Sequence, residues 1–120
     1  MSRSISVSYK SADGRDNDVD VRHNDLLGTQ ETSKAFWRLP VHKKLGIERL
    51  SQLAITDPVW FKGWGELAVL EREVTRLEQN IDSIPFPSEP KSRWIRNLRL
   101  CLDLLKASAP PDSIPEFMIG

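Results

Sequence analysis

Four aspartates lie close together near the start of the chain, and carboxylates gathered in this way could bind calcium. They are Asp13, Asp16, Asp18 and Asp20. An EF-hand loop, however, also requires a central glycine and a terminal glutamate, and this stretch supplies neither at the required position. We therefore interpret the four aspartates as a solvated acidic turn, and we expect neither a bound metal nor another cofactor.

The other side chains that could support catalysis are scattered along the sequence. His23 and His42 have no cysteine near them at the spacing of a zinc site, and Cys101 stands beside Leu102 in an apolar stretch that suits a buried residue. Glycine-rich phosphate loops and the G-x-S-x-G, H-E-x-x-H and C-x-x-C motifs are absent. The sequence therefore predicts no enzyme. The alternative, a small enzyme or metal protein, would need a site that folding assembles from scattered acids with His23 or His42.

A second group of residues could bind a partner through charge. Residues 34–49, hereafter the basic segment, hold five cations against the single acid Glu48: Lys34, Arg38, Lys43, Lys44 and Arg49. Because Phe36 and Leu39 already supply the inward side of a short helix, we expect Trp37 between them to be exposed. Tryptophan and complementary charge are typical of protein interfaces. The predicted partner-binding residues are the four aspartates of the acidic turn together with Trp37, Arg38, Lys43 and Lys44.

Length and composition restrict the class of protein. The 120 residues suit one domain, and 17 basic residues balance 17 acidic ones, so no overall field attracts nucleic acid or an anionic membrane. The first ten residues contain no apolar run typical of a signal peptide or membrane span, and a single cysteine excludes an internal disulfide. We therefore expect a cytoplasmic protein with no membrane contact.

The strongest structural pattern is a pair of apolar stripes at helical spacing. The first stripe contains Leu67, Leu70, Val74, Leu77 and Ile81, and the second contains Ile95, Leu98, Leu102 and Leu105. Four glutamates flank the first stripe: Glu66, Glu71, Glu73 and Glu78. In an antiparallel arrangement, the register that faces the two stripes also places Glu78 beside Arg99 and Glu71 beside Lys106. The sequence therefore predicts an antiparallel helical hairpin with helices over about 66–82 and 91–107.

The remaining segments carry weaker signals. Apolar and polar residues alternate over 4–10 and 18–22 around a stretch rich in turn formers, which predicts a β-hairpin within residues 1–28. Proline and glycine divide residues 29–64 into short helices, and we expect the last of these to begin at Asp57-Pro58. The apolar tail over 108–120 should pack on the body. The predicted fold class is mainly α (α+β), with a short N-terminal β-hairpin and a helical domain centred on the hairpin at 65–107.

The order of these features resembles that of small immunity proteins from bacterial toxin systems. The resemblance covers roughly residues 35–119 and is carried by Phe36-Trp37, Leu45-Gly46, Arg49-Leu50, Leu53, Asp57-Pro58, Glu66-Leu67 to Leu77, Trp94 and Leu98 to Leu105. It implies a cytoplasmic bacterial protein that binds and neutralises a cognate toxin domain and catalyses no reaction itself. If that toxin were a nuclease, the acidic turn could occupy the cleft that normally receives phosphates.

Other functions compete with this interpretation. A nucleic-acid-associated regulator could use the basic segment, although overall neutrality and the absence of a helix-turn-helix pattern make nucleic acid the lesser alternative. A small structural or adaptor protein would also fit a non-catalytic helical domain. Since apolar helical stripes can pair between chains as well as within one, a homodimer is a further alternative.

Overall fold

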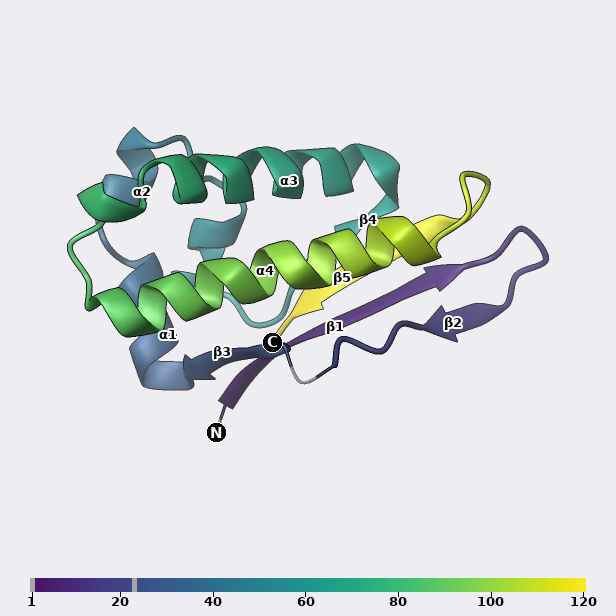
Figure 1. The fold of residues 1–120 in the computed structure, drawn as a ribbon, viewed down its shortest axis with the longest axis horizontal. Coiled ribbons are helices and arrows are strands. Elements are labelled where there is room, and N and C mark those ends of the chain that lie inside the picture. Colours follow the sequence, from purple (N-terminus) through teal and green to yellow (C-terminus); the bar gives the residue numbers. More distant parts are fainter. Residues whose placement is uncertain (1, 23) are drawn as a thin grey trace.

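The computed structural model describes residues 2–22 and 24–120, which form two layers, a β-sheet and a pair of long helices (Figure 1). The elements follow in the order β1 (Ser2–Lys10), β2 (Asp16–Asp18), β3 (Leu26–Thr29), α1 (Gln30–Trp37), α2 (Val41–Lys44), η1 (Leu50–Ala54), β4 (Val59–Lys62), α3 (Gly63–Gln79), η2 (Ile81–Ser83), α4 (Ser88–Ser108) and β5 (Ile114–Ile119). Among these described residues, none of the helices combines the length and apolar character needed to cross a bilayer.

The sheet is antiparallel, and its two central strands come from opposite ends of the sequence. β1 pairs with β5 from Ile5 opposite Ile119 to Lys10 opposite Ile114, and β4 pairs with the other side of β5. The remaining edge of β1 is shared, since β3 pairs with its first residues and β2 with its last. The sheet therefore depends on pairings between residues that are far apart in the sequence.

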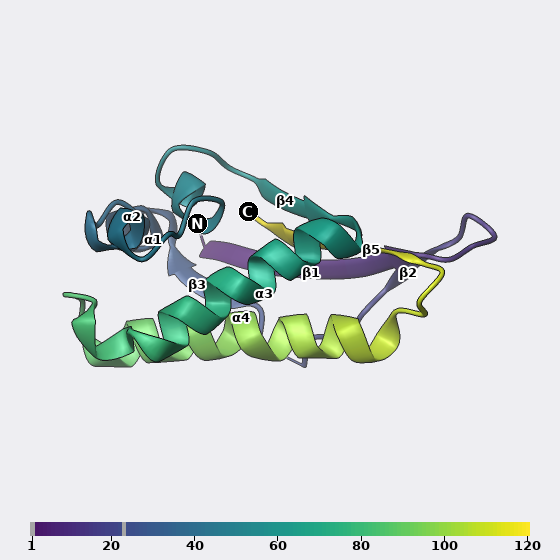
Figure 2. The same ribbon diagram turned by 90° about the horizontal axis from the view of Figure 1, so that it is seen from above.

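Helices α3 and α4 cover one face of this sheet (Figure 2). Along β1, Ile5 and Val7 point towards the helices and are buried, whereas the alternate residues Ser2 and Ser6 are exposed on the opposite face. β5 shows the same alternation, with Phe117 buried between half-buried neighbours. An antiparallel sheet with one packed and one solvated face produces this two-residue period. The core therefore lies between the sheet and the two long helices.

Helices α3 and α4 run antiparallel and are joined by charge as well as by apolar packing. Arg99 Nη2 lies 2.7 Å from Glu78 Oε1, and Lys106 Nζ lies 2.6 Å from Glu71 Oε2, so both predicted ion pairs are present. The residues of the two predicted stripes are buried except Ile81, which is half-buried: Leu67, Leu70, Val74, Leu77, Ile95, Leu98, Leu102 and Leu105. Burial of these side chains supplies most of the stability, while the charges fix the register.

The predicted mainly helical fold class is wrong, because the protein has an α+β fold in which 49% of the described residues lie in helices and 22% in a five-stranded antiparallel sheet. The N-terminal strand belongs to this sheet rather than to a small separate hairpin, and β2 occupies Asp16–Asp18 rather than 18–22. The expected helix from Asp57-Pro58 is strand β4, and the tail is strand β5. Local patterns missed these strands because the partner that completes each one is distant in sequence.

The outer edge of the sheet, at β4, is blocked by side chains. Arg49 donates a hydrogen bond to the Trp60 carbonyl, and the Glu66 carboxylate accepts one from the Lys62 N–H at 2.9 Å. Arg49 Nη2 and Glu66 Oε1 also lie 3.5 Å apart. The hydrogen bond from Lys62 lowers the pKa of Glu66, with a smaller contribution from Arg49. Two of the backbone groups on this edge, the Trp60 carbonyl and the Lys62 N–H, are thus already occupied, which leaves less of the edge for a strand of another chain.

Candidate functional site

The chain between β3 and β4 folds around a hollow of about 530 Å³, hereafter the basic pocket. It is lined by Trp37, Arg38, Leu39, Pro40, His42, Lys43, Ile47, Glu48, Ser51 and Ala54. These residues come from α1, α2, η1 and the turns between them, at the end of the sheet where β1 begins (Figure 1). Its volume lies within the range of protein sites that bind small molecules or side chains.

Trp37 forms the inner wall of the pocket and is only 2% exposed, so the expectation that it lies on the surface is wrong. Its ring meets Phe36 edge to face at 4.7 Å between centroids, and it lies 5.3 Å from the His42 ring. The helical period placed Trp37 outward, but α2 folds back and covers that side of α1. The exposed tryptophans are instead Trp60 and Trp64, at 40% and 37%.

His42 lies against Trp37 and is held in one tautomer. Its Nε2 is 2.9 Å from the Phe36 carbonyl oxygen, and because a carbonyl only accepts, Nε2 must carry the hydrogen. Burial lowers the pKa of His42, and the hydrogen bond to Phe36 opposes this shift to a lesser degree. The ring is therefore neutral at pH 7, and Nδ1 presents a lone pair.

Two buried nitrogens in the pocket wall lack hydrogen-bond partners among the described residues. They are Trp37 Nε1, which is a donor, and His42 Nδ1, which is an acceptor. Both side chains are at least 98% buried, and buried polar groups without partners are rare in folded proteins. Both nitrogens are enclosed, so they are unsatisfied groups within the wall and are not open to a molecule in the hollow.

A buried glutamate holds the opposite wall of the pocket in place. Glu73 projects from α3, and its carboxylate accepts hydrogen bonds from the N–H groups of Glu48, Arg49 and Leu50 at 3.1, 3.0 and 2.9 Å. The sequence contained a signal for this role, since Glu73 falls three residues after Leu70 and four before Leu77, on the apolar stripe itself. Glu73 is therefore a buried residue of the stripe and not one of the exposed acids that flank it.

A buried arginine fixes α1 and η1 to the sheet behind the pocket. Arg3 Nη1 donates to Ser33 Oγ at 3.1 Å and to the Leu53 carbonyl at 2.8 Å, while Nη2 donates to Gln30 Oε1 at 3.1 Å. Burial lowers the pKa of Arg3, and the charge of Asp57 partly offsets this effect. Arg3 also occupies an inward position of β1, so the two-residue alternation could have identified it.

Cations surround the mouth of the pocket. Arg38 and Lys43 line it directly, and Lys44 follows on the next position of α2; all three are exposed. Within residues 2–22 and 24–120, no acidic group lies within ion-pair distance of these three side chains, hereafter the rim cations. Their charge is therefore available to an acidic partner.

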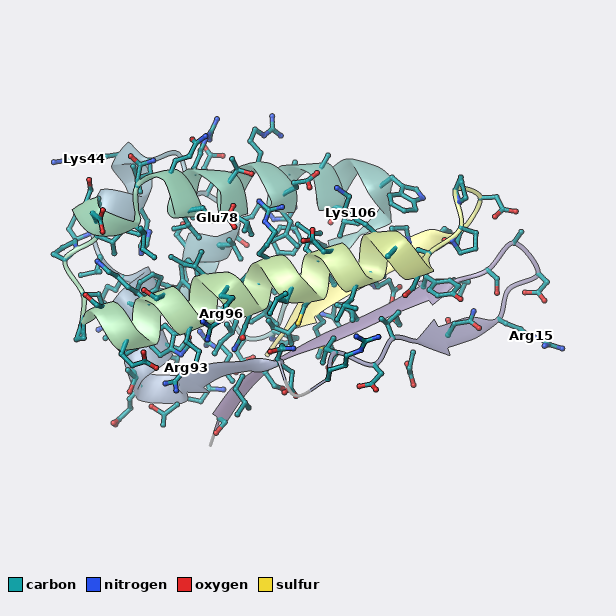
Figure 3. All side chains as sticks on the ribbon, in the orientation of Figure 1. Arg15, Lys44, Glu78, Arg93, Arg96 and Lys106 are labelled. Atoms are coloured by element: carbon teal, nitrogen blue, oxygen red, sulfur yellow. The ribbon has the colours of Figure 1, made fainter. Side chains whose placement is uncertain are left out.

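The acidic turn lies at the opposite end of the molecule, whose longest dimension is 45 Å (Figure 3). In that view Lys44 marks one end, while Arg15, within the acidic turn, marks the other. All four aspartates are exposed, and the carboxylates of Asp13 and Asp20 accept local hydrogen bonds from the N–H groups of Arg15 and Arg22. The eight predicted partner-binding residues thus form two separate groups rather than one site.

Chemistry based on metals or a thiol finds little support in the described residues. No group of three or more histidine, cysteine, aspartate or glutamate side chains is placed to hold a metal ion there, and His23 lies outside the described part. The Cys101 thiol donates to the Asn24 carbonyl at 3.1 Å, and burial raises its pKa to about 12. Such a thiol stays protonated and is a poor nucleophile.

A second hollow, of about 360 Å³, lies between β3 and α4 and is flanked by Arg93 and Arg96 (Figure 3). Two of its polar groups are already engaged, since Arg93 pairs with Glu89 at 3.5 Å and Asn97 donates to the Leu26 carbonyl at 2.9 Å, whereas Arg96 has no ion pair among the described residues. The basic pocket, which is larger and carries three neighbouring rim cations at its mouth, is therefore the better candidate site.

Neither the models of known protein families nor the curated proteins and solved structures compared with this chain give a match.

Proposed function

We propose that this chain is a non-catalytic protein-binding module that contacts an acidic surface of its partner through the basic pocket and the rim cations. The observation that carries the proposal is the combination of a preformed hollow and a mouth lined by cations that have no acidic partner among the described residues. Complementary charge guides encounter, while a pocket that fits a partner side chain supplies affinity.

The burial of Trp37 favours a protein over nucleic acid as the partner. Proteins that hold single strands without sequence preference combine cations with exposed aromatic rings on which bases stack. Here Trp37 is 2% exposed and packed against Phe36 and His42, and Phe36 is fully buried, so no base can stack on either ring. The rim cations alone would give only weak, salt-dependent attraction to phosphates.

Within this class, we propose an immunity protein that acts in the bacterial cytoplasm and neutralises a cognate toxin domain. An inhibitor of this kind needs a rigid surface complementary to its target and no reacting groups. The two anchoring networks around Arg3 and Glu73 would supply that rigidity, since they fix both walls of the pocket before a partner arrives.

Partner capture with charge-reversed variants tests the proposal. The tagged chain is purified from its native cells with nuclease added, alongside a rim variant (Arg38→Glu, Lys43→Glu, Lys44→Glu) and a matched turn variant (Asp13→Lys, Asp16→Lys, Asp18→Lys). We expect one protein that the wild type and the turn variant retain and the rim variant loses. Urea unfolding of all three proteins checks that they remain folded.

Other outcomes of the capture experiment would contradict particular parts of the proposal. Loss of the partner on nuclease treatment would indicate nucleic acid, and loss in the turn variant alone would move the contact surface to the acidic turn. The immunity assignment adds a second requirement: expression of the captured protein alone should stop growth, and co-expression of the wild-type chain should restore it. A partner that is harmless when expressed alone would exclude an immunity role.

A further inference from the structure

We propose that two copies of this chain pack together through the uncovered face of the sheet, related by a two-fold axis that runs parallel to the strands between β1 and β5. Figure 2 shows α3 and α4 on one side of the sheet only. The side chains that β1, β2, β4 and β5 present on the other side are hereafter the open face. This surface and its occupant differ from the basic pocket and its partner, so the dimer is independent of the proposed function.

Apolar side chains lie on the open face without cover. Trp60 and Ile114 are 40% and 52% exposed, and Met118 is half-buried. In the register of the sheet, Met118 has Trp60 on one side and Ser6 on the other. The apolar stripes of α3 and α4 are buried within the chain, so they are not available for pairing between chains. A contact between two copies would therefore use the open face rather than the helices.

One row of side chains crosses the open face from edge to edge and carries opposite charges at its two ends. From β2 to β4 the row reads Asp18, Ser8, Glu116 and Lys62. None of its three charged side chains forms an ion pair within the described residues, and the Lys62 Nζ lies over the Trp60 ring at 4.7 Å from the centroid. These charges are thus available to another molecule.

The order of the charges distinguishes the two ways in which two such faces can meet. Rotation about an axis parallel to the strands places β2 of one copy over β4 of the other, and β1 over β5. Asp18 then faces Lys62 of the other copy, and the Glu116 carboxylate faces the Ser8 hydroxyl, which can donate a hydrogen bond to it. An axis across the strands would set Asp18 against Asp18 and Lys62 against Lys62, which like charges disfavour. The open face is therefore complementary to itself about the parallel axis.

The shape of the open face suits a second sheet, but its area is small. The parallel axis places Met118 over Ser6 of the other copy, so a large side chain meets a small one. The strands of the two sheets would lie nearly aligned, as in a β-sandwich. Strand spacing and rise give a face of about 20 Å by 20 Å, so the dimer would bury roughly 800 Å² in total. Stable interfaces are larger, and we therefore expect a dimer that dissociates at the low micromolar concentrations of unfolding experiments.

Sedimentation equilibrium of the full chain tests the dimer. We expect a monomer–dimer equilibrium with a dissociation constant on the order of 100 µM. Asp18→Lys and Lys62→Glu should each raise this constant about tenfold, because two attractive pairs per dimer become repulsive. Asp82→Lys is the matched control, since it reverses an exposed aspartate of η2 that lies outside the open face, and it should leave the constant unchanged.

Two further measurements identify the axis and the surface. Asp18→Lys combined with Lys62→Glu exchanges the two charges and should restore the wild-type dissociation constant, which only the parallel axis predicts. The methyl NMR signal of Met118, assigned with Met118→Leu, should shift with chain concentration in the wild type and stay fixed in Asp18→Lys. Urea unfolding of each variant verifies that it is folded.

Several results would overturn the inference. The chain could remain monomeric up to about 1 mM, ten times the expected dissociation constant. Asp82→Lys could weaken association as much as Asp18→Lys does, or the charge-exchanged variant could stay as weak as the single ones. Association with a fixed Met118 signal would place the contact on another surface and exclude the open face. Partner capture depends on the rim cations, so each of these results leaves the proposed function to its own test.

Discussion

The basic pocket and the acidic turn both present clustered charge at an end of the molecule, but only the pocket is built into the core. Its walls are tied to α3 by Glu73 and to β1 by Arg3, through hydrogen bonds made by fully or almost fully buried side chains. The aspartates of the turn make only local hydrogen bonds and are exposed. Clustered charge alone therefore does not identify a site, and charge placed over a hollow with fixed walls is the stronger candidate.

Substitution of the buried glutamate should have the largest effect. Glu73→Gln leaves three backbone N–H groups to share one good acceptor, so we expect the free energy of unfolding to fall by about 3 kcal/mol. Urea unfolding measures this loss. The same variant should weaken partner capture, because residues 48–50 would lose their anchor.

The matched control for this change is Glu71→Gln on the same helix. Glu71 is half-buried and pairs with Lys106 and Arg99 near the surface, so its neutralisation should cost less than about 1 kcal/mol. Equal losses in the two variants would show that Glu73 is no more important to the fold than a surface ion pair.

The pocket should also make stability depend on pH, through His42. Burial lowers the pKa of His42 below the unfolded value of 6.5, so the unfolded state takes up its proton first as the pH falls. The contribution of the neutral ring is thus complete above pH 6.5 and is lost below it, by at most about 1.4 kcal/mol per pH unit. The difference in unfolding free energy between pH 7.5 and pH 5.5 measures this effect.

His42→Gln isolates the contribution of this one histidine. Glutamine does not titrate and can still donate to the Phe36 carbonyl, so the loss of stability between the two pH values should be smaller in the variant than in the wild type. His23 and all carboxylates are common to both proteins and cancel in the comparison. An identical pH dependence would indicate that His42 titrates normally.

Neutralisation of the acidic turn should have the smallest effect. Asp16→Asn with Asp18→Asn changes two exposed side chains at the edge of the sheet, where no buried group depends on them. We expect the free energy of unfolding to stay within about 0.5 kcal/mol of the wild type. A loss near that of Glu73→Gln would mean that the turn supports the fold and would remove the contrast between the two ends.

The sequence predicted the helical hairpin well because its evidence was redundant. The apolar stripes and the pairs Glu78 with Arg99 and Glu71 with Lys106 required the same register, and the structure contains both pairs. The sheet had no comparable signal. Pairing of β1 with β5 joins residues near opposite ends of the sequence, and Asp57-Pro58, which is typical of a helix start, instead comes directly before strand β4.

The candidate site was predicted in part. Arg38 and Lys43 were predicted from the cluster of cations in the sequence, and both line the mouth of the pocket. The position of Trp37 in the wall was predicted wrongly. Trp37 was placed outward from the period of α1 alone, whereas its burial depends on His42 of the following helix. Glu73 and Arg3 occupy inward positions of α3 and β1, so the apolar periodicity of each element indicates that they are buried. Their roles, however, depend on backbone groups that only folding brings near them.

The central position of β5 has a consequence for synthesis of the protein on the ribosome. β1 is made first but lies beside β5, which is translated roughly a hundred residues later, a delay on the order of 5 to 20 seconds. During that interval the nascent β1 can pair only with β2 and β3, and its other edge lacks the strand that finally pairs with it. The sheet can therefore be completed only after β5 has left the exit tunnel of the ribosome. Until then we expect chaperones to bind the growing chain.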